Sequence, residues 1–150
     1  MLEIGFGPGV DIQRVSQMAV GGFVAGVDHS EVMLDQARKR NAAAIRAGRV
    51  ELRLGPASPL PYTDNSFDKI FSINVAQFWD ESVEVLVELQ RVLRPGGLIV
   101  TAVQPRSNDQ PARMTGRKLV EDHRAAGFSE IRLESKRMKP APTVCAICTK

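Results

Sequence analysis

Short, mainly apolar runs alternate with longer amphipathic stretches along the whole 150-residue chain. Short apolar runs are typical of strands buried in a sheet, whereas apolar positions that recur every three or four residues over about ten or more predict helices. The pattern predicts strands over residues 2–5, 23–27, 50–54, 67–73, 98–103, 128–135 and 143–149, and helices over residues 10–20, 31–47, 81–93 and 112–126.

The order of these elements predicts the fold class. Strands that alternate with helices require right-handed crossovers and a mainly parallel sheet. The last two strands are joined only by a short segment that contains Pro140 and Pro142, so they are expected to pair antiparallel. The sequence predicts an α/β fold, a doubly wound Rossmann-like sheet of seven mostly parallel strands with a C-terminal antiparallel hairpin. A chain of this length is expected to form one domain over residues 1–150.

Three glycines directly after the first strand are the first candidate site. Gly5, Gly7 and Gly9 are spaced G-x-G-x-G and lead into the first predicted helix. Ligands of doubly wound sheets bind beyond the carboxyl ends of the strands, at the switch point beside the first strand. The glycine loop is therefore in the place where a nucleotide-like ligand is expected.

Two acidic residues restrict the kind of ligand. A nicotinamide dinucleotide fingerprint would have its third glycine at position 10, where this chain has Val10. Glu3, two residues before the first glycine, would repel a pyrophosphate and suits a ligand with an ammonium and a sulfonium group. Asp28, at the end of the second strand, is placed to hold two ribose hydroxyls. Val10 and Glu3 therefore favour a cationic nucleoside over a dinucleotide, whereas Asp28 suits both classes of cofactor.

Four segments then resemble one known family, in the family's own order. They read LEIGFGPG, GVDHS, LPYTDNSFDKIFSINVAQFW and LQRVLRPGGLIV, and AGFSEIRL with a final strand completes the match. The chain resembles a class I S-adenosylmethionine-dependent methyltransferase of the small-molecule type. The resemblance implies S-adenosyl-L-methionine as the cofactor and a small molecule as the methyl acceptor.

The resemblance also implies roles for individual residues. Asp28 would hold the ribose, His29 would pack on the adenine, and the carbonyl of Asn74 would accept a hydrogen bond from the cofactor's ammonium. Where the family has Gly-Asp-Ala this chain has Gly-Pro-Ala at 55–57, so a contact with the adenine amine is lost unless Ser58 replaces it. The implied cofactor-binding residues are Glu3, Gly5, Gly7, Gly9, Asp28, His29, Ala57, Ser58 and Asn74.

The methyl acceptor is expected at the loops after the fourth and fifth strands. Methyl transfer from a sulfonium needs mainly alignment of the partners, which can contribute several kcal/mol, up to about 7–11. The candidate acceptor-binding residues are Gln77, Trp79, Gln104 and Arg106. They form neither a triad nor a carboxylate pair, so the sequence assigns no catalytic residue and no metal site.

Charge is unevenly distributed along the chain. Residues 1–90 have 8 Lys and Arg against 12 Asp and Glu, whereas residues 91–150 have 12 against 5. A basic half can attract an acidic substrate or nucleic acid. Because the charges are scattered, a solvated surface is the simpler interpretation, and no nucleic-acid partner is predicted.

Apolar run lengths and cysteine content indicate the compartment. No run approaches the roughly 20 apolar residues of a membrane span, so no membrane partner is predicted. Two cysteines and the lack of an export signal favour the cytoplasm.

Cys145 and Cys148 lie three apart on a predicted strand, so they are expected on opposite faces, one of them buried. His123 is expected on the surface of the last helix.

The start of the chain leaves the function open between three hypotheses. Members of the family that this chain resembles carry helices before the first strand, which cover the acceptor pocket, and no such segment precedes Leu2 here. The chain is therefore expected to be a fragment, or a minimal methyltransferase covered by a homodimer or partner subunit. The first alternative is a non-catalytic cofactor-binding or scaffold protein, and the second is an NAD-dependent oxidoreductase.

Overall fold

The chain forms two compact units, residues 1–60 and 61–150. They are described here from a computed structural model that covers residues 1–104, 112–139 and 141–150, and the side chains from residue 116 onward in the last helix. None of the helices in these ranges is both long enough and apolar enough to cross a membrane.

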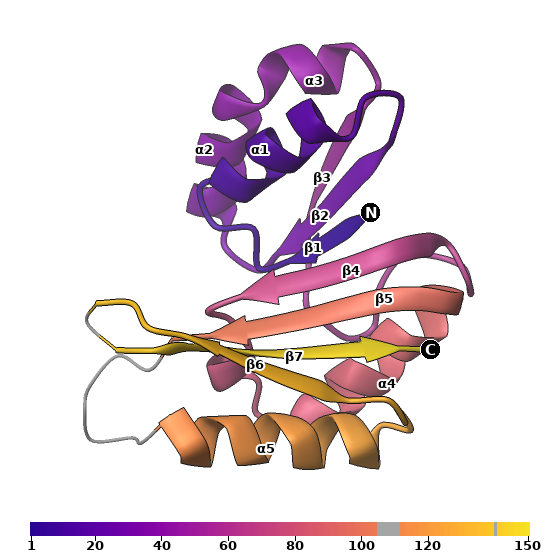
Figure 1. The fold of residues 1–150 in the computed structure, drawn as a ribbon. Helices are drawn as coiled ribbons and strands as arrows, with labels where there is room; N and C mark the ends of the chain where they lie inside the picture. Colours follow the sequence, from indigo (N-terminus) through magenta and orange to yellow (C-terminus); the bar gives the residue numbers. More distant parts are fainter. Residues whose placement is uncertain (105–111, 140) are drawn as a thin grey trace. The chain divides into compact units, whose positions relative to one another are not determined.

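The first unit is a three-stranded parallel sheet with helices packed on one face (Figure 1). The core between them contains Ile12, Leu34, Ala44 and Leu52, which come from all three helices and from the sheet. The elements are β1 (Leu2–Ile4), α1 (Val10–Met18), β2 (Val24–Asp28), α2 (Glu31–Arg40), α3 (Ala42–Arg46) and β3 (Val50–Leu54), and the strands lie in the order β3-β2-β1. Each predicted strand of this unit is confirmed.

The predicted helix over residues 31–47 is two helices, and the prediction of one helix is wrong. It begins as expected, with the Ser30 hydroxyl accepting a hydrogen bond from the Met33 N–H at 3.4 Å. It is interrupted at Asn41, whose side chain is buried and whose amide donates to the carbonyls of Ala37 at 2.9 Å and Gly9 at 3.0 Å. A side chain that bonds to the backbone competes with regular helix, and here it joins α2 to the glycine loop.

Gly9 is required by packing as well as by backbone conformation. Its φ is +75°, and a Cβ at this position would lie 2.7 Å from both Ala37 Cβ and Asn41 Nδ2. Gly7, at φ +50°, would place a Cβ in open space, with nothing within 4 Å. Packing and backbone conformation therefore both require glycine at position 9, whereas backbone conformation alone favours it at position 7.

We expect Gly9→Ala to lower the free energy of unfolding by about 3 kcal/mol, because overpacking and left-handed strain add. Gly7→Ala, the matched control, has the strain alone and should lose about 1–2 kcal/mol. Urea denaturation of both variants measures the difference. Equal losses would show that α2 yields to the added methyl group.

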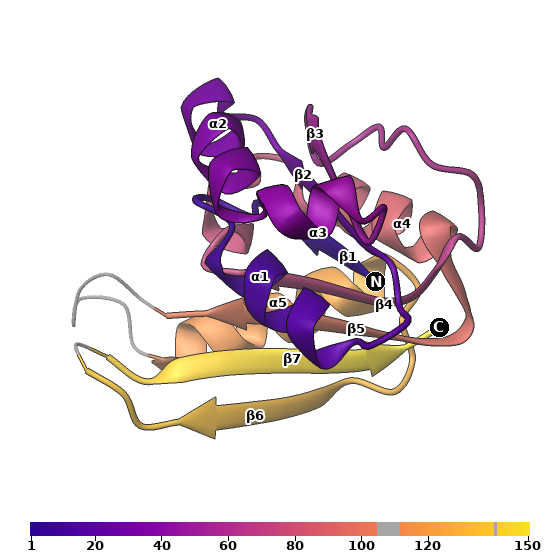
Figure 2. The same ribbon diagram turned by 90° about the horizontal axis from the view of Figure 1, so that it is seen from above.

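The second unit contains the remaining four strands, in the order β4-β5-β7-β6 (Figure 2). The pairing of β4 with β5 is parallel, and both pairings of β7 are antiparallel, which confirms the predicted C-terminal hairpin. The elements are β4 (Phe67–Ile73), the short 3-10 helix η1 (Ala76–Phe78), α4 (Ser82–Val92), β5 (Leu93–Val103), α5 (Ala112–Ala125), β6 (Arg132–Lys136) and β7 (Thr143–Thr149).

Two strands of this unit begin several residues away from their predicted starts. β5 begins at Leu93 instead of residue 98, because Leu93 already pairs with Phe67 before a register shift brings Leu98 opposite Lys69. The glycines in this stretch are held by the chain end, where Gly96 N donates to the Lys150 carbonyl at 2.9 Å. β6 begins at Arg132 rather than residue 128, because Phe128 N donates to the His123 carbonyl and continues the end of α5.

The face of this sheet that packs on α5 buries two residues of interest. Cys148 is buried there and Cys145 is half-buried on the opposite face, as predicted, and both thiols are free. His123 is completely buried, so its predicted surface position is wrong. Its Nδ1–H donates to the Leu119 carbonyl at 2.7 Å, which leaves Nε2 to accept from the Thr101 hydroxyl at 3.1 Å.

We expect this buried histidine to make the fold acid-sensitive. Burial lowers the pKa of His123 below its usual 6.5, although the Leu119 carbonyl and Asp122 oppose the shift. Its contribution to stability is therefore complete above pH 6.5 and is lost as the pH falls through the lower folded value, by at most about 1.4 kcal/mol per pH unit. Urea denaturation between about pH 7 and pH 5 should show this loss, and the slope should flatten in His123→Asn.

Candidate functional site

The carboxyl edge of the first unit carries the glycine loop. Gly5, Gly7 and Gly9 all have positive φ, at 71°, 50° and 75°. The loop is tied to the sheet by Gly5 N, which donates to the Val27 carbonyl at 2.8 Å. Because a Cβ on Gly7 would meet nothing within 4 Å, the loop leaves open space at its middle, where a ligand can approach the backbone.

Asp28 organises this edge through both of its carboxylate oxygens. Oδ2 accepts from Gly7 N at 2.8 Å, and Oδ1 accepts from Ser30 N at 2.9 Å. A carboxylate can accept about four hydrogen bonds, so each oxygen keeps a lone pair for hydroxyl donors of a ligand. His29, the next residue, is exposed, and its Nδ1 lies 3.8 Å from Asp28 Oδ1.

Glu3 is a buried carboxyl group with an unsatisfied oxygen. Only 2% of the residue is exposed, and no donor among the described residues reaches its Oε2. Burial, together with the negative charges of Asp11 and Asp28, raises the pKa of Glu3 from 4.5 to about 8. A buried unpaired acceptor in an acidic surrounding is stabilised by a cationic donor, which is the charge predicted for the ligand.

An apolar residue that the sequence analysis did not single out completes this edge. In β3, Val50 and Leu52 are buried, and the alternation would bury Leu54 too, yet Leu54 is 51% exposed. Leu54 lies opposite Asp28 in the parallel register. Val32 of α2 is exposed as well. The sequence could have indicated Leu54, because it is the apolar last residue of an alternating strand and stands directly before Gly55.

The segment after β3 contains the remaining residues of the predicted cofactor site in this unit. Ala57 and Ser58 are both half-buried, and Pro56 between the strand and these residues is exposed. Eight of the nine predicted cofactor-binding residues, from Glu3 to Ser58, thus belong to the first unit. Asn74, the ninth, belongs to the second unit.

Asn74 is the centre of a hydrogen-bond network at the carboxyl edge of the second unit. It has φ 57°, and its Oδ1 accepts from Gln104 N at 2.7 Å. Its carbonyl, the atom predicted to meet an ammonium, accepts from Gln77 Nε2 at 3.1 Å and keeps its second lone pair. Gln104 Nε2 in turn donates to the carbonyls of Lys139 at 3.1 Å and Ala141 at 2.8 Å.

The network separates the predicted acceptor-binding residues into two kinds. Gln77 and Gln104 use their amide N–H groups inside the chain, where they hold the loops after β4 and β5 in place. Trp79 is half-buried, and its indole N–H has no hydrogen-bond partner among the described residues. Arg106 lies outside the described residues.

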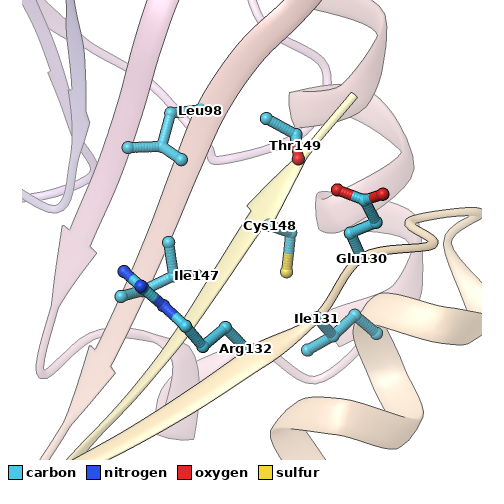
Figure 3. A pocket seen from close by; sticks show the side chains of 7 residues that line it. All are labelled: Leu98, Glu130, Ile131, Arg132, Ile147, Cys148 and Thr149. Carbon is cyan, nitrogen blue, oxygen red and sulfur yellow. The ribbon is translucent and has the colours of Figure 1, made fainter.

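Two cavities lie away from these edges. One of about 410 Å³ opens where β6 diverges from β7, and it is lined by Leu98, Arg132 and Cys148 among others (Figure 3). It is lined by the last residues of β7, which pair with the middle of β5, so it lies away from the carboxyl end of β5 and is not part of the candidate site. Another, of about 380 Å³, lies beside α3 and β3 and is lined in part by Ile45 and Leu52. Within the described ranges, no cluster of three His, Cys, Asp or Glu residues could hold a metal ion.

Comparison with known proteins identifies the class. Residues 2–101 match the family described as "Methyltransferase domain". The chain is also 33% identical over 153 residues to the uncharacterized methyltransferase YdaC of Bacillus subtilis (strain 168), with 100% of this chain and 82% of that protein covered. The chain therefore belongs to the methyltransferase domain family. Its class is that of the class I S-adenosylmethionine-dependent methyltransferases, with S-adenosyl-L-methionine as the cofactor.

Another curated relative has a named activity. The demethylmenaquinone methyltransferase of Symbiobacterium thermophilum is 36% identical over 101 residues, which cover 67% of this chain and only 40% of that protein.

Solved structures show the fold. A S-adenosylmethionine-dependent methyltransferase from Aquifex aeolicus has a TM-score of 0.79 at 21% identity, covering 98% of this chain and 79% of that one. The [4+2]-cyclase SpnF has a TM-score of 0.81 at 22% identity, covering 99% of this chain and 74% of that one. The predicted α/β fold, with its mostly parallel Rossmann-like sheet and antiparallel C-terminal strands, is thereby confirmed.

Proposed function

We propose that this protein transfers a methyl group from S-adenosyl-L-methionine to a small-molecule acceptor. The observation that carries the proposal is the buried Glu3 carboxyl with its unpaired Oε2, on the same unit as an open glycine loop and a carboxylate with spare lone pairs. The cofactor supplies an already activated methyl group on a sulfonium, so the protein has to bind and align rather than activate.

Different residues of the first unit bind different parts of the cofactor in this proposal. Asp28 accepts hydrogen bonds from the ribose hydroxyls with the lone pairs that Gly7 N and Ser30 N leave free. Glu3 holds the cationic amino-acid part, which passes the open side of the loop at Gly7. The exposed side chains of His29 and Leu54 offer flat and apolar surfaces to the adenine. Ala57 and Ser58 form the proposed edge of this half-site.

The residues of the second unit orient the acceptor. The role of Asn74, whose carbonyl is predicted to accept from the cofactor's ammonium, stays a prediction, because Asn74 belongs to the second unit. Gln77 and Gln104 are positioning residues, because their amide groups hold the loops rather than project free donors. The Trp79 indole N–H is buried and has no hydrogen-bond partner among the described residues, so it is the proposed donor to the acceptor, and Arg106 is a further proposed acceptor contact. Single-domain organisation, cytoplasmic location and a homodimer or partner that covers the site stay predictions.

A second candidate function is a non-catalytic cofactor-binding or scaffold role. SpnF has this fold and is described as a [4+2]-cyclase, so the fold alone does not imply methyl transfer. The replacement of the family's acidic residue by Pro56 removes one adenine contact and favours a binding or scaffold role. A nicotinamide oxidoreductase remains opposed by Val10 and Glu3.

Isothermal titration with S-adenosylmethionine, S-adenosylhomocysteine and NAD distinguishes these functions. We expect both sulfur nucleosides to bind and NAD to give no heat of binding. Release of S-adenosylhomocysteine in the presence of a pool of small acceptors would then support methyl transfer. Binding without any turnover would favour the scaffold, and binding of NAD alone would overturn the proposed cofactor site.

A further inference from the structure

Three cations are concentrated at the connection between β6 and β7. Lys136, Arg137 and Lys139 are all exposed, and none of them forms an ion pair with an acidic residue in the part of the chain that the structure describes. By contrast Arg132, earlier on β6, pairs with Glu134 at 3.2 Å. The positive charge at the end of the hairpin is therefore not neutralised from within the described chain.

This connection lies at the carboxyl edge of the second unit. Because β7 is antiparallel to β5, its first residues pair with the last residues of β5, with Val144 opposite Val103. Both views show the hairpin beyond the carboxyl ends of β4 and β5 (Figures 1 and 2). The hairpin is anchored there, since Gln104 Nε2 donates to the carbonyls of Lys139 and Ala141.

Apolar side chains accompany the cations on this edge. Met138, between two of them, is 52% exposed and accepts a hydrogen bond from the Thr143 hydroxyl at its sulfur, at 3.4 Å. Phe78 of η1 is 56% exposed and Ile73 at the end of β4 is 40% exposed. We define the hairpin edge as Ile73, Phe78, Lys136, Arg137, Met138 and Lys139.

We propose that the hairpin edge docks on the headgroup surface of an anionic phospholipid bilayer. Its cations match the negative lipid headgroups, and its exposed methionine, phenylalanine and isoleucine can enter the boundary between headgroups and acyl chains. Such docking needs no membrane-spanning helix, because the protein stays at the surface. It would bring the proposed acceptor loops, which share this edge, close to compounds dissolved in the bilayer.

The polar groups of the edge favour lipid over nucleic acid. Recognition of bases uses free amide donors and acceptors together with aromatic stacking. Here Asn74 Oδ1, Gln77 Nε2 and Gln104 Nε2 all bond within the chain. The groups that remain at the surface are cations and mainly aliphatic side chains, which suit headgroups and acyl chains.

Co-sedimentation of the full chain with vesicles tests the proposal. Two preparations are compared, phosphatidylcholine alone and phosphatidylcholine with about one third phosphatidylglycerol, at about 0.1 M and about 1 M salt. We expect binding to the anionic vesicles only, and its loss at high salt. The triple variant Lys136→Glu, Arg137→Glu, Lys139→Glu should bind at least about 100-fold more weakly, because each cation near an anionic surface contributes roughly fivefold and the new carboxylates add repulsion.

A matched variant controls for net charge. Arg38→Glu, Lys39→Glu and Arg124→Glu change the charge equally at exposed cations of α2 and α5, and should leave vesicle binding within about threefold. Met138→Asp should weaken binding without removing a cation. The proposal is overturned by absent binding, by equal losses in both triple variants, by equal binding to neutral vesicles, or by tighter binding to an oligonucleotide. Titration of the hairpin variant with S-adenosylmethionine shows separately whether the fold and the proposed function persist.

Discussion

Asp28→Ala is expected to weaken the binding of S-adenosylmethionine by about 100-fold or more. The variant removes the proposed acceptor of the ribose hydroxyls, and hydrogen bonds to a charged group contribute about 1.5–3 kcal/mol each. It also releases Gly7 N and Ser30 N, which the carboxylate holds at 2.8 and 2.9 Å. The lost ribose hydrogen bonds and the released loop, at about 1.4 kcal/mol each, already weaken the affinity by about 100-fold.

Cys145→Ala is the control for this prediction. Cys145 is half-buried on β7 and forms no disulfide, so its removal changes packing in the second unit but no proposed contact of the cofactor. Titration calorimetry at one pH measures both variants. If they bind with equal affinity, the assignment of Asp28 to the ribose is wrong. Asp28→Asn, which keeps the shape but loses the charge, should bind with intermediate affinity.

Binding of S-adenosylmethionine is also expected to strengthen steeply with pH through Glu3. Burial, with help from Asp11 and Asp28, raises the pKa of Glu3 to about 8, so near pH 6 only about 1% of the free protein has the ionised carboxylate that attracts a cation. The apparent affinity scales with the population of the binding-competent form. We expect a gain of about 50-fold between pH 6 and pH 8.

Glu3→Gln removes this dependence and provides the test. The variant should bind more weakly than the natural protein at about pH 8 and show a nearly flat profile between about pH 6 and pH 8. Binding to the natural protein below pH 8 should release a proton, which calorimetry detects as a dependence of the measured heat on the buffer. A pH profile that is the same in both proteins would show that Glu3 does not meet the cationic part of the ligand.

The same carboxyl group has a predictable effect on stability. Because the folded pKa is raised from 4.5 to about 8, the folded state holds a proton that the unfolded chain loses. Stability is therefore complete below pH 4.5 and falls as the pH rises through about 8. The free energy of unfolding of Glu3→Gln should exceed that of the natural protein increasingly over this range, by up to a few kcal/mol. Bound cofactor should reduce the difference.

The particular errors of the sequence-based prediction have a common physical cause. Asn41 was predicted inside a helix, because its neighbours have the helical pattern, but its side chain bonds to Gly9, 32 residues away. His123 was predicted on a surface because of its polarity, but it fills a buried position where Thr101 and Leu119 satisfy both ring nitrogens. β5 was predicted to start five residues too late, because Phe67 on another strand pairs with its first residue.

Local patterns by themselves determined the order in which strands and helices alternate, because periodicity and turn residues depend only on neighbours along the chain. They also placed Gly5, Gly7, Gly9 and Asp28 at a strand end, where a ligand site was expected. Only the tertiary structure decided that Glu3 keeps an unpaired oxygen and a raised pKa, that Leu54 stays exposed, and that Gln104 anchors the β6–β7 hairpin. Burial, solvation and hydrogen bonds between distant residues arise only when the chain is folded, so no local pattern contains them.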